Sequence, residues 1–138
     1  MLTLLAIMMV SISCERENNP ADLIKALEGR WLVDEQSEFY KSTSGTYYVD
    51  ISISSEDSSK IFISNFYDLN YQNVTANVSS NMVELDPDQE ISIYTYTYCI
   101  QSGSGIVSDD YQSIEWQYNV DDGSGQVDHV KAIYTKKQ

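Results

Sequence analysis

Apolar residues alternate with polar residues along most of this chain, from Arg30 to Thr135, and this alternation limits the fold more than any other feature. Successive side chains of a β-strand point to opposite faces of the sheet, so a period of two predicts strands with one dry face and one wet face. Several segments show the pattern clearly, and their apolar members are Val49, Ile51 and Ile53, then Val74, Ala76 and Val78, then Ile114, Trp116, Tyr118 and Val120, and finally Val130, Ala132 and Tyr134.

Short clusters of turn-forming residues separate these segments, for example 55–59, 79–81, 86–88 and 121–125. The sequence predicts about eight or nine strands, at 30–36, 46–54, 60–66, 71–79, 82–85, 90–100, 103–108, 112–120 and 126–135. Loops this short leave no room for crossover helices, so we expect an antiparallel meander. Closing such a sheet removes its exposed edges. The predicted fold class is therefore all-β, an antiparallel up-and-down barrel.

One short helix is expected before the strands, because Pro20 suits a first helical position and Gly29 can end a helix in the left-handed conformation. A helix of about two turns is not stable alone. Its apolar face must therefore pack on something, such as the end of the barrel, and this face is formed by Leu23, Ile24 and Leu27.

The first thirteen residues carry no charged side chain and run directly into Cys14 and a polar stretch. An apolar run this short fits the core of a secretory signal better than a membrane span. The alternative, a buried first strand or helix at 2–10, is less favoured because the run has no polar periodicity. Ser13-Cys14 resembles the lipobox of bacterial lipoproteins, in which the signal is removed and the Cys becomes the lipid-modified amino terminus.

This resemblance implies a signal peptide at 1–13, a lipidated Cys14 with its linker at 14–20, and one domain at 21–138. Removing 13 of the 138 residues leaves 125, which suits a single domain. The protein would then be anchored to a membrane of the cell envelope. Glu15 and Glu17 resemble the acidic residues that direct some such lipoproteins to the cell surface, so the outer membrane is the expected location.

Gly29-Arg30-Trp31 lies directly after the predicted helix, at the start of the first strand. The triplet resembles the Gly-x-Trp signature of lipocalin-type barrels, and the chain as a whole resembles small lipocalin-like lipoproteins of unassigned activity. The resemblance covers roughly 21–135 and implies that Trp31 plugs the closed end of the barrel. Lipocalins commonly place an Arg across that Trp, whereas here Lys136 and Lys137 follow the last strand.

Tyrosines occur at every second position from Tyr94 through Tyr96 to Tyr98, which predicts that all three lie on one side of one strand. Facing inward, they would give a ligand site stacking surfaces and hydrogen-bonding groups. Facing outward, they would form a surface for a protein or glycan partner. Ile91 and Ile93 have the opposite phase, which favours outward tyrosines, and a β-bulge between Ile93 and Tyr98 would reverse the assignment.

Two functions follow from these aromatic residues. The first is a carrier of a small apolar or glycan ligand, with the barrel lined by some of Trp31, Trp116, Tyr118 and Tyr134. The second is a non-enzymatic interaction module of an envelope complex, with a solid barrel and a surface at 94–98. An interior packed shut by Trp116 and Tyr118 would exclude the carrier.

Other classes of function are not expected from this sequence. A formal net charge of −13 repels phosphate backbones, so nucleic acid is not an expected partner. His129, the only histidine, is predicted to be exposed on a strand, and no nucleophile motif accompanies it, so the protein is not expected to be an enzyme. The loop 121–128 lacks the ligand spacing of an EF-hand, and Gly103-Ser104-Gly105 is predicted to be a bend or bulge. Cys99 is interpreted as a core or strand residue, and no metal or cofactor is expected.

Overall fold

The computed structural model describes residues 20–39, 46–70 and 72–138; Cys14 and the predicted signal lie outside them. Helix α1 (Pro20–Leu27) comes first and confirms the predicted helix. The other described elements are β1 (Gly29–Ser37), β2 (Tyr47–Ile53), β3 (Lys60–Ile63), the short 3₁₀-helix η1 (Phe66–Asp68), β4 (Val74–Ser79), β5 (Met82–Leu85), β6 (Gln89–Ile93), β7 (Tyr96–Val107), β8 (Ser113–Asp121) and β9 (Val127–Lys136).

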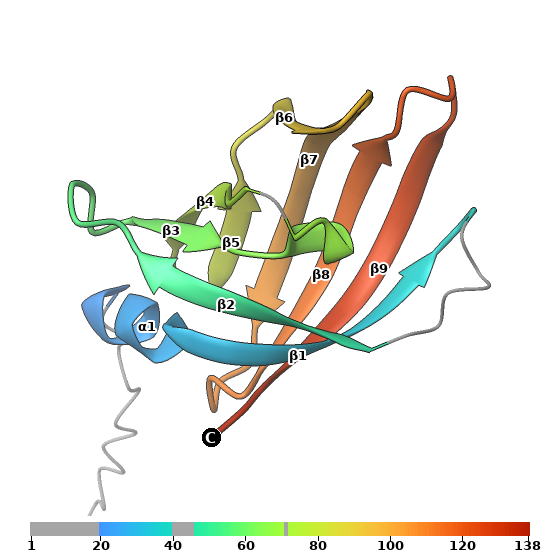
Figure 1. Ribbon diagram of the computed structural model, residues 1–138. Coiled ribbons are helices and arrows are strands. Elements are labelled where there is room, and N and C mark those ends of the chain that lie inside the picture. The colour runs from blue at the N-terminus through green and yellow to red at the C-terminus, as the bar shows by residue number, and fades with distance from the viewer. Residues whose placement is uncertain (1–19, 40–45, 71) are drawn as a thin grey trace, which may run out of the picture.

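The strands form one closed antiparallel barrel (Figure 1). Neighbouring strands pair in the order β5-β4-β3-β2-β1-β9-β8-β7, and the barrel closes where Met82 to Glu84 of β5 pair with Ser104 to Ile106 of β7. β6 is an extra strand that pairs only with the first part of β7. The predicted fold class, an all-β barrel with a short N-terminal helix, is confirmed.

The predicted dry faces of the strands fill the barrel, and α1 covers one of its ends (Figure 1). Leu23, Ile24 and Leu27 are buried against the barrel, and α1 contacts β2 and β4. At this closed end Trp31 is fully buried, and its indole N–H donates a hydrogen bond to the carbonyl oxygen of Leu27 over 2.9 Å. The helix and the first strand are therefore joined through this side chain.

Lys136, at the end of β9, lies across the ring of Trp31. Its ammonium group lies 5.5 Å from the centre of the Trp31 ring and also donates a hydrogen bond to the carbonyl oxygen of Ala26. A cation over an indole face is attracted by the ring quadrupole. The last strand is thus fastened to the helix-covered end.

The predicted strands at 90–100 and 103–108 are wrong. β6 ends at Ile93, the chain turns at Tyr94-Thr95, and β7 then runs without a break to Val107. Tyr94 has a left-handed φ of 54°, and Ile93 pairs with Tyr96 across the turn. A two-residue hairpin turn needs left-handed backbone, usually supplied by Asn or Gly, so Tyr-Thr gave no recognisable turn signal.

Because of this turn, the side chains of β7 point to the opposite faces from those predicted. In β7 the inward positions include the half-buried Tyr98 and the buried Ile100, while Thr97 is exposed. Tyr94, Tyr96 and Tyr98 consequently do not share one face of one strand. The prediction of a single tyrosine stripe on one strand is wrong for the same reason.

Two glycines lie inside β7 rather than between strands. Gly103 pairs with Tyr118 and Gly105 with Trp116. A Cβ on Gly103 would lie 2.4 Å from Cβ of Tyr118, and one on Gly105 would lie 2.8 Å from ring atoms of Trp116. The glycines therefore leave room for the two aromatic side chains, and the irregularity in register lies between Ile100 and Ser102.

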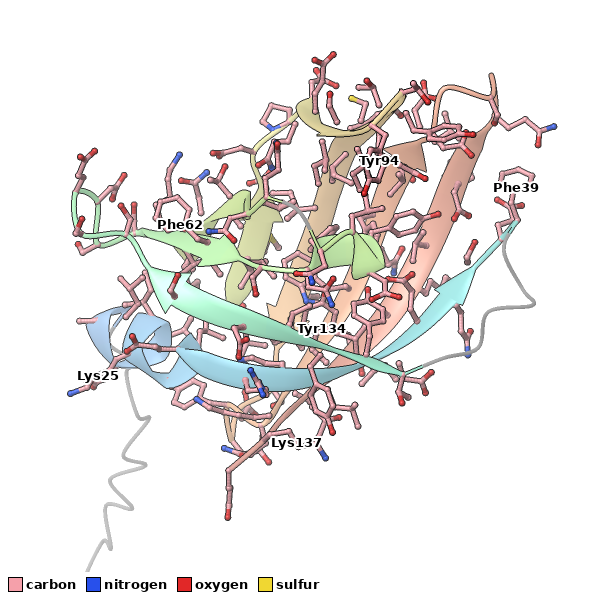
Figure 2. All side chains as sticks on the ribbon, in the orientation of Figure 1. Lys25, Phe39, Phe62, Tyr94, Tyr134 and Lys137 are labelled. Atoms are coloured by element: carbon pink, nitrogen blue, oxygen red, sulfur yellow. The ribbon has the colours of Figure 1, made fainter. Side chains whose placement is uncertain are left out.

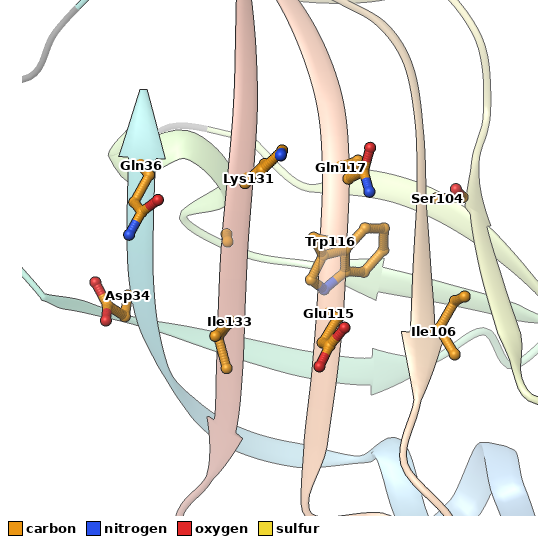
Figure 3. A pocket seen from close by; sticks show the side chains of 10 residues that line it. Asp34, Gln36, Ser104, Ile106, Glu115, Trp116, Gln117, Lys131 and Ile133 are labelled. Atoms are coloured by element: carbon orange, nitrogen blue, oxygen red, sulfur yellow. The ribbon is translucent and has the colours of Figure 1, made fainter. Parts of the chain in front are cut away.

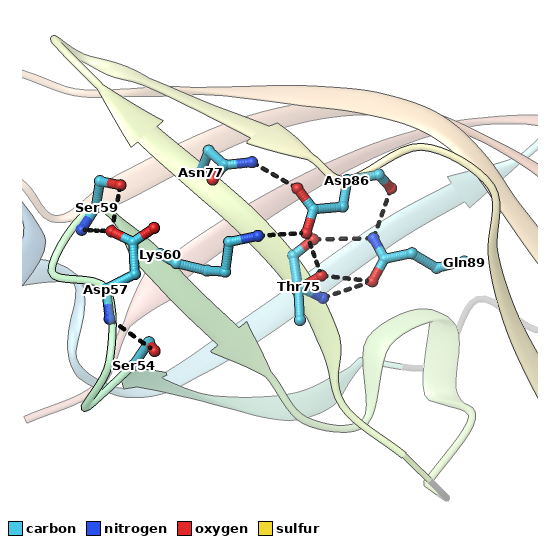
Figure 4. A network of polar contacts seen from close by, with 8 residues as sticks. All are labelled: Ser54, Asp57, Ser59, Lys60, Thr75, Asn77, Asp86 and Gln89. Atoms are coloured by element: carbon cyan, nitrogen blue, oxygen red, sulfur yellow. Dashed lines mark hydrogen bonds and ion pairs between the residues drawn. The ribbon is translucent and has the colours of Figure 1, made fainter.

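A polar network holds the corner between β5 and β6 against β3 and β4 (Figure 4). The Asp86 carboxylate accepts hydrogen bonds from Lys60, Thr75 and Asn77, over 2.8, 2.6 and 2.5 Å. The Gln89 side chain accepts from the backbone N–H of Thr75 and donates to its carbonyl oxygen, over 2.7 and 2.9 Å. Gln89 thus pairs with the Thr75 N–H beyond the end of β5, while the Thr75 carbonyl oxygen also accepts from the backbone N–H of Asp86.

Candidate functional site

The interior of the barrel contains a group of polar side chains that we call the interior cluster: Glu35, Tyr47, Tyr118 and Tyr134. They come from β1, β2, β8 and β9, and each has the phase of the buried residues in its strand. Glu35 follows Trp31 and Val33, for example, and Tyr47 precedes Val49 and Ile51. The side chains therefore meet inside the barrel, where Figure 2 shows Tyr134 among the crowded interior residues.

The Glu35 carboxylate receives two hydrogen bonds on one oxygen. The Tyr47 hydroxyl donates to Oε2 over 2.5 Å, and the Tyr118 hydroxyl donates to the same atom. Among the described residues, Oε1 of Glu35 has no hydrogen-bond partner. The structure thus leaves one oxygen of a half-buried carboxylate available.

Burial raises the pKa of the Glu35 carboxyl, and the nearby charges of Asp128 and Asp68 raise it further, although the two tyrosine hydrogen bonds act in the opposite direction. Burial likewise raises the pKa of Tyr118 and Tyr134 well above the ordinary phenol value. These hydroxyls consequently stay protonated and act as hydrogen-bond donors.

Two fully buried polar atoms have no hydrogen-bond partner among the described residues. They are the hydroxyl of Tyr134, which belongs to the cluster, and the indole N–H of Trp116, which lies beside it. The two residues are 0 and 1% exposed, and their ring centres lie 5.6 Å apart. Leaving a buried polar group unpaired costs about 1–3 kcal/mol, and such groups in native proteins usually meet water or a ligand. Together with Oε1 of Glu35, they define a set of unfilled polar positions.

The 3₁₀-helix η1 brings two further aromatic rings to this region. Phe66 is fully buried, and its ring centre lies 4.6 Å from that of Tyr118 and 6.1 Å from that of Trp116. The Tyr67 ring meets the Tyr118 ring edge-on at 6.3 Å. Tyr67 and its neighbours Asn65 and Asp68 all have φ near 55°, a conformation that long-range contacts must maintain.

Asp128 is the buried charged residue of the described core, and it fastens three elements together. Its carboxylate accepts hydrogen bonds from the Ser37 hydroxyl over 2.6 Å, the backbone N–H groups of Glu38 and Phe39 over 2.9 and 3.3 Å, and the Tyr67 hydroxyl over 2.7 Å. Asp128 thereby joins β9 to the end of β1 and to η1. We call these five residues the Asp128 clamp.

The structure distributes the residues that the sequence singled out over three places. Tyr94 and Tyr96 are 99 and 64% exposed at the β6–β7 hairpin, while Tyr98 is half-buried with its ring centre 6.5 Å from that of Tyr67. The other predicted ligand or partner residues, Trp116, Tyr118 and Tyr134, are buried inside the barrel, and Trp31 lies at the closed end. These residues do not form one surface.

Sequence reasoning missed Glu35, Tyr47 and the role of Asp128. A signal for two of them was present. Glu35 continues the dry phase of Trp31 and Val33, and Asp128 has the phase of the buried Val130. A carboxylate on the dry face of a strand must be paired or functional, because burying a charge without a partner is costly.

The outer surface carries a pocket of about 430 Å³ across β1, β9, β8 and β7 (Figure 3). One row of its residues runs from Asp34 through Ile133 and Glu115 to Ile106, each paired with the next across the sheet. Ile133 and Ile106 are 51 and 54% exposed, and Met82, which pairs with Ile106, is 43% exposed. The row therefore places apolar side chains on the outside of the barrel.

His129 is exposed on β9, with Nδ1 2.7 Å from the side-chain oxygen of Asn119. Within residues 20–39, 46–70 and 72–138, no group of three or more His, Cys, Asp or Glu side chains is arranged to hold a metal ion. In the same ranges, no helix is long and apolar enough to cross a membrane.

The sequence matches no protein-family model, and a search of curated proteins finds no significant relative. The fold therefore defines the class of protein: an all-β, closed eight-stranded antiparallel barrel with one extra strand and one short helix. Such a barrel is compatible with a lipocalin-like fold and with ligand binding.

Proposed function

We propose that this protein is a lipid-anchored lipoprotein of the bacterial cell envelope that binds a small ligand inside its barrel, at the interior cluster. The observation that carries the binding proposal is the set of unfilled polar positions: the Tyr134 hydroxyl, the Trp116 indole N–H and Oε1 of Glu35. A small number of convergent polar groups within an aromatic lining is typical of small-molecule sites.

The polar lining refines the expected ligand. A purely apolar molecule would leave all three positions unpaired, whereas a ligand with hydrogen-bonding groups can satisfy them. A glycan or another polar small molecule is therefore preferred to a lipid chain. Aromatic rings of Tyr67, Tyr98 and Tyr118 would contact its apolar parts.

A copurification experiment tests ligand binding. The lipoprotein is purified from its native host as wild type and as Tyr134→Phe, and small molecules released from each are compared by mass spectrometry. Tyr134→Phe removes only the unpaired hydroxyl, so its fold should survive. We expect a compound retained by the wild type and lost or strongly depleted in the variant. Identical profiles from both proteins would contradict the proposed site.

A second function, an interaction module of an envelope complex, is favoured because Trp116 and Tyr118 fill part of the barrel interior. The outer apolar row of Met82, Ile106 and Ile133 and the exposed Tyr94 and Tyr96 also favour it. Aromatic and aliphatic anchors of this kind are common in protein interfaces. Crosslinking in cells should trap one partner with the wild type and lose it with Ile106→Ser. An unchanged crosslink would argue against this surface.

A further inference from the structure

The interior cluster is anionic as well as aromatic. The charges of Asp128 and Asp68 lie close enough to Glu35 to affect its ionisation. Glu35 and Asp128 are also linked through rings, since Tyr118 bonds Glu35, Tyr67 bonds Asp128 and the two rings are in contact. Two carboxyl groups, those of Glu35 and Asp128, are therefore tied to one pair of contacting rings.

No basic side chain of the described residues compensates these carboxyl groups. The ion pairs found there, Arg30–Asp50 and Lys60–Asp86, join other residues. The donors on Glu35 are neutral phenols, and the donors on Asp128 are a hydroxyl, a phenol and two backbone amides. These donors stabilise negative charge without neutralising it, so the described part of the site favours a cation.

The uncompensated charge lies beside two kinds of group that suit an organic cation. Oε1 of Glu35 can accept a charge-assisted hydrogen bond, and the buried Tyr134 hydroxyl points to a missing partner in the same interior. The half-buried rings of Tyr67 and Tyr98, whose centres lie 6.5 Å apart, are aromatic surfaces of the kind that attract cations. Glu35, Tyr67 and Tyr98 are half-buried, so each of these side chains is partly exposed to solvent.

We infer that the ligand of the interior cluster is a small organic cation, an amine whose ammonium group donates to Oε1 of Glu35 and whose apolar part packs against the tyrosine rings. The Trp116 indole N–H is itself a donor, so an acceptor elsewhere on the ligand would pair with it. This inference rests on the proposed function and names its ligand class. A neutral glycan would leave the carboxyl groups uncompensated, and an anion would be repelled.

Three probes of matched size test the charge. Phenethylamine, phenethyl alcohol and phenylacetate carry a positive, neutral and negative group on the same ring scaffold. Calorimetric titration of the signal-free protein at neutral pH should show phenethylamine binding at least about tenfold more tightly than the alcohol, with no binding of phenylacetate. Equal affinities for the amine and the alcohol would overturn the cation inference while leaving ligand binding intact.

Two matched variants test whether Glu35 causes the preference for the amine. Glu35→Gln should remove the preference for the amine over the alcohol, whereas Glu56→Gln, an exposed residue outside the cluster, should keep it. Thermal melting of both variants establishes that each is folded. A preference for the amine that survives in Glu35→Gln would contradict the assigned site. If no probe binds the wild type, the cation inference fails, and the copurification experiment decides the proposed function separately.

The pH dependence of binding gives an independent readout. The ionisable groups facing Glu35 are Tyr47 from β2, Tyr118 and Tyr134 with Asp128 from β8 and β9, and Asp68 from η1. The phenols stay protonated below neutrality, so they do not change charge over this range. Glu35→Gln separates the titration of Glu35 from that of the other carboxyl groups. Affinity for phenethylamine should rise as the pH rises toward neutral, and this rise should disappear in Glu35→Gln. An affinity that does not change with pH in the wild type would count against the inference.

Discussion

At the scale of single residues, Glu35 determines the chemistry of the interior. Its carboxyl group is held by the hydroxyls of Tyr47 and Tyr118 in surroundings that raise its pKa. A carboxyl whose pKa is raised by folding binds its proton more tightly in the folded state than in the unfolded state. Its favourable contribution to stability is present below the unfolded pKa and is lost as the pH rises through the folded pKa.

We therefore predict that Glu35→Gln changes the pH dependence of stability. The free energy of unfolding of the wild type, measured relative to the variant by urea denaturation, should fall between pH 4 and pH 8. The fall in the free energy of unfolding should be about 1.4 kcal/mol for each unit by which folding raises the Glu35 pKa. The opposite slope would show that folding lowers this pKa.

Trp31 acts at the helix-covered end of the barrel. It is fully buried, bonded to Leu27 and covered by Lys136. Trp31→Ala should lower the free energy of unfolding by about 3–5 kcal/mol, as for other buried aromatic residues. Thermal melting of the two proteins measures the effect, with Trp31→Phe as the milder control. An unchanged midpoint would show that Trp31 does not support the closed end.

At the scale of elements, η1 depends on the Asp128 clamp. The left-handed backbone at Asn65, Tyr67 and Asp68 is unfavourable locally, so contacts from distant elements must maintain it. Tyr67 supplies one through its hydrogen bond to Asp128, and Phe66 supplies another by packing on Tyr118. η1 therefore places its rings in the barrel because β8 and β9 hold them there.

Asp128→Ala should consequently destabilise the fold by about 2–4 kcal/mol, because it leaves the buried hydrogen-bond donors of the clamp without an acceptor. Chemical denaturation measures this loss. Asp109→Ala, at an exposed turn, is the matched control and should change stability by less than about 0.5 kcal/mol. Equal effects of the two substitutions would show that the Asp128 clamp does not stabilise the fold.

Local patterns predicted most elements of this fold but not the assembly of its interior. Alternation located the strands around Val49, Val74 and Trp116, because each has one dry face. The β6–β7 hairpin was missed because Tyr94-Thr95 lacks turn chemistry. The positions of Phe66 and Asp128 depend on partners dozens of residues away, which the sequence does not reveal.

At the scale of the whole molecule, the proposed anchor would lie at the helix-covered end of the barrel. α1 covers the closed end and begins at Pro20, six residues after Cys14. An extended chain spans at most about 3.5 Å per residue, so a lipid on Cys14 would hold this end within about 20 Å of the membrane. The end formed by the β6–β7 hairpin and the β8–β9 turn would then face away from the membrane (Figure 1).

Cys14→Ser tests the anchor directly. The variant should move from the membrane fraction to the soluble fraction, because lipid chains each contribute about 0.8 kcal/mol per buried methylene and a serine carries none. The signal-free domain should melt at the same temperature with either residue. A Cys14→Ser protein that still sediments with membranes would contradict lipid anchoring.

The most direct test of binding inside the barrel compares the two indole N–H groups by NMR. Trp31 bonds Leu27 at the closed end, whereas Trp116 has an unpaired N–H beside the interior cluster. Titration with phenethylamine should shift the Trp116 indole signal and leave the Trp31 signal in place, so that the protein contains its own control. A Trp116 signal that stays fixed at saturating amine, or equal shifts of both signals, would contradict the account.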